Sequence, residues 1–200
     1  ITGQNFIQNL HELIGQHDAP VYTISYYVQW LLMEHIAQHG YRISVSGTAA
    51  DELLTGYYDH QNLYLNELRN TPLLESALAD WSDYVAPLVR NPFLQNPRLY
   101  FGNSGFRDHI YFGSSEFSDY LIRDWQEEFS EETYTESLLR NRMLNELFHE
   151  VVPVILHEDD LNAMYYSIEN RSPFLDRALF EFCCRIPTRH LVRDGCTKVV

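Results

Sequence analysis

The residues best suited to chemistry lie at positions 46–52, where the chain reads S-G-T-A-A-D-E. Small residues let a ligand approach the backbone, and a helix that begins there offers free N–H groups and the positive end of its dipole to an anion. Asp51, in the first turn of that helix, could hold a Mg²⁺ ion that bridges phosphate oxygens. Taken alone, such a run is more often an ordinary strand-to-helix turn.

A second group of candidates lies in the last third of the chain. Glu169 and Arg171 could pair and fix the loop before Pro173. Lys198, the only lysine, follows Gly195 and could bring a mobile positive charge to a phosphate. The alternatives are a purely structural ion pair and an exposed lysine near the chain end.

Other patterns do not reach the spacing that their chemistry needs. The run 149–153, H-E-V-V-P, has proline where a zinc-protease helix needs its second histidine. Acidic residues and a histidine at 157–160 could suggest a metal cluster, but we expect a solvated helix start there. Cys183, Cys184 and Cys196 lack zinc-site spacing, so we expect buried or partly buried free thiols in a reducing cytoplasm.

Composition excludes several classes of protein. A net charge of −14 on 200 residues disfavours general binding to nucleic acid. The chain lacks an apolar run of the roughly 18–20 residues that a membrane span needs, and no secretory signal is visible. The length allows one domain or two small ones, and because the chain begins with Ile1 we expect a fragment or a processed chain.

The elements that must position these residues are mostly helical. One strand is expected within 41–47, where apolar residues alternate before the small-residue run, and a helix follows it. Helix on both sides predicts a strand of a parallel sheet whose partners lie outside this segment. Residues 91–107, rich in proline and glycine, should form an irregular loop. The other expected helices are 5–17, 24–38, 62–69, 73–89, 131–150 capped by Ser130, 159–167 and 175–185.

Together, these segments resemble the synthetase domain of the glutamine-dependent asparagine synthetases. The family's pattern S-G-E-G-A-D-E-L-F-G-G-Y stands here as S-G-T-A-A-D-E-L-L-T-G-Y at 46–57. Its D-D-R-N-S-M and S-I-E-V-R-V-P-F-L-D match 159–164 and 167–176, and its R-D-G-x-T-K matches 193–198. The middle, about 61–150, has no motif that we can match.

The resemblance implies an α/β fold, a fragment of a parallel-sheet, adenine-nucleotide alpha-hydrolase-like (ATP-pyrophosphatase) domain that is predominantly helical here. It implies ATP-dependent amidation of a carboxylate, through an acyl-adenylate, with ammonia that a glutaminase domain releases from glutamine. The cofactors would be ATP and Mg²⁺, and the partners a small-molecule carboxylate and glutamine-derived ammonia. Neither nucleic acid nor a membrane span is expected, the location would be cytoplasmic, and a homodimer is one option.

Residue by residue, the resemblance assigns Ser46 and Gly47 to the nucleotide and Asp51 to Mg²⁺ and pyrophosphate. Lys198 matches the lysine that stabilises phosphate charge as pyrophosphate leaves. Glu169 and Arg171 match the loop that shapes the acceptor side.

Three departures bear on the substrate. Thr48 stands in the catalytic position where the family usually has glutamate, and threonine cannot act as an acid or base in its place. Leu161 replaces an arginine, and Ala49 replaces a glycine. An amidotransferase for another acceptor, such as a sugar uronic acid of a surface polysaccharide, and a catalytically dead homologue that serves as a binding module are the alternatives.

Two parts of the family's machinery do not occur in this sequence. They are the S-G-G-x-D-S pyrophosphate loop and the N-terminal glutaminase domain. Residues 1–200 are therefore expected to be a partial asparagine synthetase-like domain that is inactive in isolation.

Overall fold

The computed structural model describes residues 3–123 and 129–199, which form two compact units. Unit 1 comprises residues 1–49 and 148–180, and unit 2 comprises residues 50–147 and 181–200. Described elements in chain order are α1 (Phe6–His17), α2 (Ile24–Gln38), β1 (Ile43–Val45), α3 (Ala50–Leu54), α4 (Tyr58–Leu68), α5 (Leu74–Asp80), α6 (Leu99–Gly102), α7 (Ser114–Ser118), α8 (Leu138–Asn145), α9 (Val152–Tyr165), β2 (Glu169–Arg171), α10 (Arg177–Arg185), β3 (Val192–Arg193) and β4 (Cys196–Thr197).

The core of unit 1 is built where α1, α2 and α9 pack together. Leu13, Tyr27 and Trp30 form one buried cluster. Met33 forms a second cluster with buried residues of α9 and of the segment just before β2. The helical spacing of apolar residues predicts α1 to within a residue and α2 at its observed bounds.

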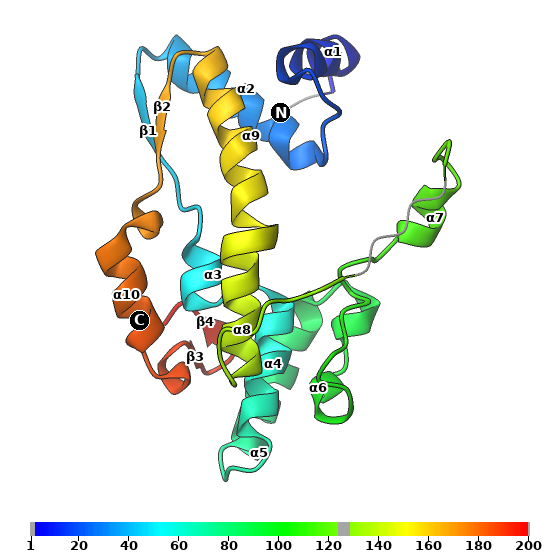
Figure 1. The fold of residues 1–200 in the computed structure, drawn as a ribbon, viewed down its shortest axis with the longest axis vertical. Coiled ribbons are helices and arrows are strands. Elements are labelled where there is room, and N and C mark those ends of the chain that lie inside the picture. The colour runs from blue at the N-terminus through cyan, green and yellow to red at the C-terminus, as the bar shows by residue number, and fades with distance from the viewer. Residues whose placement is uncertain (1–2, 124–128, 200) are drawn as a thin grey trace. The chain divides into compact units, whose positions relative to one another are not determined.

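The sheet of unit 1 has two parallel strands (Figure 1). Ile43 pairs with Glu169 and Val45 with Arg171, and the Ser46 N–H donates to the Arg171 carbonyl at 2.8 Å beyond the ladder. The parallel direction is confirmed. The expectation that all strand partners lie outside the segment is wrong, because residues 169–171, expected to be a loop, form β2.

Unit 2 is organised around α4, a helix whose polar residues are mostly buried. Its Leu65 packs with Trp81, Val85, Val89 and Leu94 in the apolar core of the unit. The chain covers this core with a π-helical turn over Trp81–Val85 and 3₁₀ turns over Ala86–Leu88 and Pro92–Leu94.

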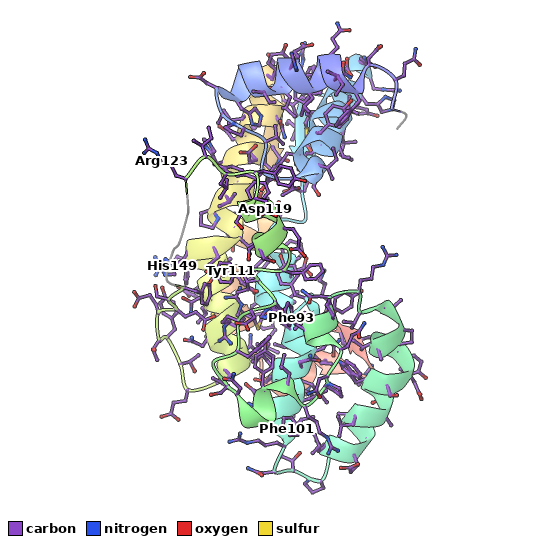
Figure 2. All side chains as sticks on the ribbon, turned by 90° about the vertical axis from the view of Figure 1, so that its right-hand side faces the viewer. Phe93, Phe101, Tyr111, Asp119, Arg123 and His149 are labelled. Atoms are coloured by element: carbon purple, nitrogen blue, oxygen red, sulfur yellow. The ribbon has the colours of Figure 1, made fainter. Side chains whose placement is uncertain are left out.

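Aromatic side chains organise the proline- and glycine-rich segment of unit 2. Phe93 and Phe101 extend from its short helical turns (Figure 2), and Phe101 packs against the apolar core. The Phe93 ring lies 5.9 Å from that of Phe106 and 6.3 Å from that of Phe112. The expected loop over 91–107 is therefore mostly irregular but contains a 3₁₀ turn and α6.

Two expected helix starts in the C-terminal half are wrong. The helix expected from Glu131 begins only at Leu138, where the Ser137 hydroxyl accepts the Arg140 N–H as N-cap. Leu139, Met143 and Leu147, spaced four residues apart, form a buried apolar stripe. The helix expected from Asp159 begins seven residues earlier, at Val152, because Pro153 is tolerated in a first helical turn.

Two further expectations concern the membrane and the cysteines. Within the described residues, no helix is both long and apolar enough to cross a membrane. The three cysteines are free thiols as expected, and Cys183 is buried. Cys184 and Cys196 are exposed, so the expected burial is wrong for these two.

Candidate functional site

The end of β1 holds a cluster of hydroxyl groups in unit 1. The Ser46 Oγ lies 3.0 Å from the Thr48 Oγ1 and 3.1 Å from the Ser172 Oγ. The Ser46 backbone is fixed by its bond to the Arg171 carbonyl, which places it beside Ser172 at the end of β2. Gly47 is exposed, with open space where a side chain would stand. The backbone at this bend is thus open to a ligand.

The hydroxyl cluster continues into a buried carboxylate on α9. The Thr48 hydroxyl donates to the Asp159 Oδ2 at 3.2 Å, and the Asn170 amide approaches the same oxygen at 3.4 Å. Burial raises the pKa of Asp159 and Glu158 adds to this rise, whereas the hydrogen bonds of Thr48 and Gln29 act in the opposite direction.

The expectation of a solvated helix start at 157–160 is therefore wrong. Glu158 and Asp159 lie inside α9 and are each 2% exposed. The Glu158 Oε2 lies 2.9 Å from the His17 Nδ1 of α1, while the His17 Nε2 lies 2.9 Å from the Asn162 side chain. The acidic residues on this face of α9 serve the interior of unit 1.

Glu169 and Arg171 form an ion pair at 2.9 Å on β2, as their spacing predicts. Both side chains are more than half exposed. The hydrogen bond from Arg171 lowers the pKa of Glu169. Since the pair stands on one side of the β1–β2 sheet, it leaves the Asn170 side chain on the other, toward Asp159.

Asp51 and Lys198, distant in sequence, meet in unit 2. The Lys198 Nζ lies 2.5 Å from the Asp51 Oδ1, and both side chains remain partly exposed. Asp51 belongs to α3, and Lys198 directly follows the antiparallel β3–β4 hairpin. The first and last motifs of the sequence thus contribute opposite charges to one place.

Two glycines make this meeting possible. A Cβ on Gly56 would stand 1.4 Å from the Asp51 Oδ1, so only glycine leaves room for that carboxylate. Gly195 turns the hairpin at φ +72°, and a Cβ there would stand 2.8 Å from the Cβ of Tyr84.

Glu52 and Tyr57 lie next to Asp51 in unit 2. Glu52 is buried, and its Oε1 accepts the Tyr57 hydroxyl at 2.5 Å. Burial and this hydrogen bond raise the pKa of Tyr57 well above its usual range. Their i, i+5 spacing across Gly56 gives no sequence signal, because the chain leaves the helix between them.

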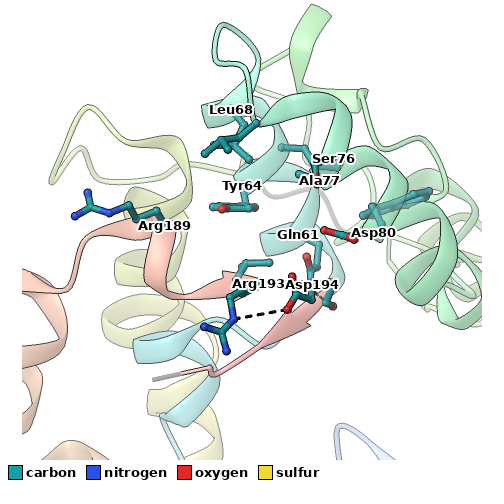
Figure 3. Close-up of a pocket in the computed structure, with 14 residues that line it drawn as sticks. Gln61, Tyr64, Leu68, Ser76, Ala77, Asp80, Arg189, Arg193 and Asp194 are labelled. Atoms are coloured by element: carbon teal, nitrogen blue, oxygen red, sulfur yellow. Dashed lines mark hydrogen bonds and ion pairs between the residues drawn. The ribbon is translucent and has the colours of Figure 1, made fainter.

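Two hollows flank the β3–β4 hairpin. One, of about 280 Å³, lies between the hairpin and α4–α5, and Arg193 and Asp194 pair at 3.7 Å on its rim (Figure 3). The other, of about 330 Å³, is lined by Gly56, Tyr57, Tyr84 and Thr197 among others. Gly56 lies two residues after the helix of Asp51, and Thr197 directly precedes Lys198.

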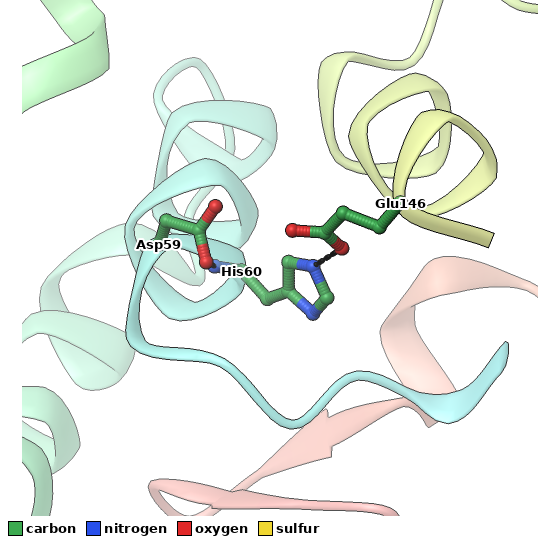
Figure 4. A group of neighbouring side chains, drawn as sticks. All are labelled: Asp59, His60 and Glu146. Atoms are coloured by element: carbon green, nitrogen blue, oxygen red, sulfur yellow. Dashed lines mark hydrogen bonds and ion pairs between the residues drawn. The ribbon is translucent and has the colours of Figure 1, made fainter. Parts of the chain in front are cut away.

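A buried group of charged residues in unit 2 was also not foreseen. Asp59, His60 and Glu146 offer ligand atoms within 4.8 Å of one another (Figure 4). The Gly56 N–H donates to the His60 Nδ1, so the Nε2 carries the proton and donates to Glu146 at 2.6 Å. The Arg142 Nε, 3.1 Å from Glu146 and 3.5 Å from Asp59, already supplies the positive charge that a metal would bring.

The backbone is strained where the family pattern has glycine. Ala49 has φ +76° and Thr55 has φ +68°, in the left-handed region that glycine adopts without cost. The family motif has glycine at both positions. Both residues carry a Cβ, so the left-handed conformation is strained at each of them.

The predicted site residues therefore fall into two groups, one in each unit. Ser46, Gly47 and Thr48 belong to unit 1 together with the Glu169–Arg171 pair, and Asp51 and Lys198 belong to unit 2. The convergence of both groups around one nucleotide stays a prediction.

Comparison with known proteins gives one family. The family model described as asparagine synthase matches residues 1–200 of the chain. Neither a curated protein nor a solved structure gives a significant match.

Proposed function

The chain belongs to the asparagine synthase family, a membership that indicates a ligase-type, amide-forming function, and from it we propose the specific reaction. The protein that contains this chain activates a carboxylate with ATP as an acyl-adenylate and releases pyrophosphate. Ammonia derived from glutamine then attacks the adenylate, and the products are an amide and AMP.

The Asp51–Lys198 pair is the observation that carries this proposal. A carboxylate oxygen and an ammonium group, 2.5 Å apart and both reachable from solvent, suit a magnesium ion and a negatively charged pyrophosphate side by side. Asp51 would hold Mg²⁺, which neutralises phosphate charge when bound. Lys198 would stabilise the negative charge that develops on the leaving pyrophosphate.

The open bend at Gly47 supports a place for the nucleotide in unit 1. Ser46 offers a hydroxyl and Gly47 an uncovered backbone at the carboxyl end of a parallel strand, where open α/β sheets bind their ligands. The exposed Glu169–Arg171 pair would shape the acceptor side, with Arg171 free to exchange its partner for a substrate carboxylate.

A second candidate, an acceptor other than aspartate, is favoured by position 161. Leu161 stands on α9 where the family has arginine, and its backbone carbonyl accepts the Gln16 amide. A leucine side chain offers no positive charge to a second carboxylate of the substrate. A sugar uronic acid, which has one carboxylate and many hydroxyls, fits this change better than aspartate does.

The proposal is tested on the complete gene product with ATP, Mg²⁺ and glutamine or ammonia. Aspartate and a panel of uronic acids are offered, and pyrophosphate and amide are measured. We expect one carboxylate to yield both products in equal amounts. Lys198→Met should lower pyrophosphate release by about 10²-fold or more, whereas Arg193→Gln, an exposed cation on the same hairpin, should leave it unchanged. Full activity of Lys198→Met would contradict the role of the pair.

A further inference from the structure

Three departures from the family's motifs meet in one hydrogen-bonded cluster. The family patterns have glutamate at position 48 and valine at positions 170 and 172, where this chain has Thr48, Asn170 and Ser172. All three are polar, and all three contact either Ser46 or Asp159. Position 48 belongs to one motif, and positions 170 and 172 belong to another. The fold of this chain therefore brings the three polar side chains together.

The hydroxyl groups of this cluster can be assigned a direction. An ionised carboxylate only accepts hydrogen bonds, so the Thr48 hydroxyl donates its proton to Asp159. In the 3.0 Å hydrogen bond between Thr48 and Ser46, the donor is then the Ser46 hydroxyl. In the 3.1 Å hydrogen bond between Ser46 and Ser172, the donor is in turn the Ser172 hydroxyl. Every donor in the series Ser172, Ser46, Thr48 therefore points toward Asp159.

The two ends of this series differ in what they can accept. Ser172 is only half-buried, and its oxygen keeps a lone pair for an N–H or O–H donor from a bound molecule. Asp159 is 2% exposed, and its second oxygen, Oδ1, is buried without a well-formed hydrogen bond among the described residues. Burial raises the pKa of Asp159, which brings this carboxyl closer to the range in which a base works near neutral pH.

We propose that Ser172, Ser46 and Thr48 form a directed hydroxyl relay that carries a proton from the amide-forming nitrogen to Asp159. The relay supplies the proton acceptor that position 48 lacks, by placing the carboxylate one hydrogen bond further away, on α9. This inference rests on the amide-forming reaction proposed above.

The lone pair of ammonia forms a C–N bond to the acyl carbon of the adenylate, and the C–O bond to AMP breaks with its electron pair on the AMP phosphate. One N–H proton passes to the Ser172 Oγ, while Ser172 gives its own proton to Ser46, Ser46 to Thr48, and Thr48 to Asp159. The products are the amide, AMP and a protonated Asp159, which returns its proton to solvent.

The kinetic test separates amide formation from adenylate formation in the complete gene product. Thr48→Val removes the hydroxyl at nearly constant volume, and Thr48→Ser keeps it as the matched control. We expect Thr48→Val and Asp159→Asn each to slow amide formation by about 10²-fold. Carboxylate-dependent exchange of pyrophosphate into ATP should remain within about twofold of the unaltered protein. Thr48→Ser should retain both activities.

A double variant tests whether Asp159 accepts a proton or has only a structural role. Thr48→Glu combined with Asp159→Asn returns a carboxylate to position 48, so amide formation should recover at least tenfold over Asp159→Asn alone. A merely structural Asp159 would give no such recovery, and equal amide-formation rates in Thr48→Val and Thr48→Ser would overturn the relay while exchange persists. Absence of exchange in the unaltered protein with every carboxylate would overturn the proposed function and the relay together.

A second readout does not depend on activity. The Thr48 hydrogen bond lowers the pKa of Asp159, so Thr48→Val should raise that pKa in a carbon-13 NMR titration of the carboxyl, and Thr48→Ser should not. An equal pKa of Asp159 in the two variants would show that Thr48 does not donate to Asp159, and this would overturn the relay.

Discussion

At the scale of single residues, two positions that carry a side chain adopt backbone angles typical of glycine. Ala49 is buried at φ +76°, and Thr55, fully buried at φ +68°, holds its position through hydroxyl bonds to the Leu54 and Leu191 carbonyls. A left-handed conformation costs a residue with a Cβ about 1–2 kcal/mol. The structure therefore stores strain on both sides of Asp51 and Glu52.

Ala49→Gly should stabilise the protein because it relieves this strain. The gain, reduced by the greater flexibility of glycine in the unfolded chain, is expected to be about 1 kcal/mol in the free energy of unfolding. Ala50→Gly, one residue later in α3, should instead destabilise by about 0.5–1 kcal/mol. Urea unfolding of both variants makes the comparison, and a loss of stability in Ala49→Gly would show that the backbone there is not strained.

The residues that sequence could identify are those whose role lies in a motif. Asp51 and Lys198 are predicted from two motifs far apart in the sequence, and the structure brings their side chains together in unit 2, whereas their roles stay a prediction. Asp159 was misjudged because three neighbouring acids and a histidine suggest a solvated surface. Its burial follows from contacts with Thr48 and Asn170, which are 111 and 11 residues away and leave no local pattern.

At the scale of elements, a charged network joins α4 to α8 and to the segment before α8. Arg142 of α8 contacts Glu131 at 2.8 Å, Glu146 at 3.1 Å and Asp59 of α4 at 3.5 Å, and it is 4% exposed. Arg107 holds Glu131 from a second side through both carboxylate oxygens, at 2.9 and 2.6 Å. These contacts explain why residues 131–137 are not helical, since Glu131 is drawn into the network.

Removal of Arg142 should therefore be costly. Arg142→Met keeps the length of the side chain but leaves buried carboxylates without their partner, and we expect a loss of about 3–5 kcal/mol. Arg98→Met is the matched control, because Arg98 meets Glu75 at 3.7 Å on an exposed surface and its loss should cost less than about 1 kcal/mol. Equal effects of the two substitutions in urea unfolding would contradict a structural role for the network.

The same network should weaken in acid. Burial alone would raise the pKa of Glu131, but the hydrogen bonds from Arg107 and Arg142 outweigh it and hold the pKa below its usual range. A lowered folded-state pKa stabilises above the unfolded-state value of about 4.3, and this contribution is lost as pH falls below it. Glu131→Gln should be less stable at pH 7 and lose less stability between about pH 5 and 3 than the unaltered chain. If Glu131→Gln lost as much stability in acid as the unaltered chain, Glu131 would be excluded as a source of the acid sensitivity.

How well elements could be predicted depended on whether their signal was local. Helices α1 and α2 follow from apolar periodicity, and the Asp176 side chain accepts the Leu179 N–H at the start of α10. Strand β2 has only charged and amide side chains, and it is a strand because β1 offers it a parallel ladder. Pairing of this kind depends on tertiary contacts that composition does not reveal.

At the scale of the whole molecule, the site motifs are distributed over two units. Unit 1 contains the hydroxyl cluster with Asp159, and unit 2 contains the Asp51–Lys198 pair beside an open hollow. In the proposed reaction, the hydroxyl cluster with Asp159 would act in amide formation and the Asp51–Lys198 pair on the leaving pyrophosphate. Membership in the asparagine synthase family over residues 1–200 is what joins the two groups in one proposed reaction.

The most direct measurement of this account is carboxylate-dependent exchange of labelled pyrophosphate into ATP by the complete gene product. If Asp51 and Lys198 act as proposed, exchange requires Mg²⁺ and one carboxylate, and it falls by about 10²-fold in both Asp51→Asn and Lys198→Met. Exchange that is equally fast in these two variants, or no exchange with any carboxylate offered, would contradict it.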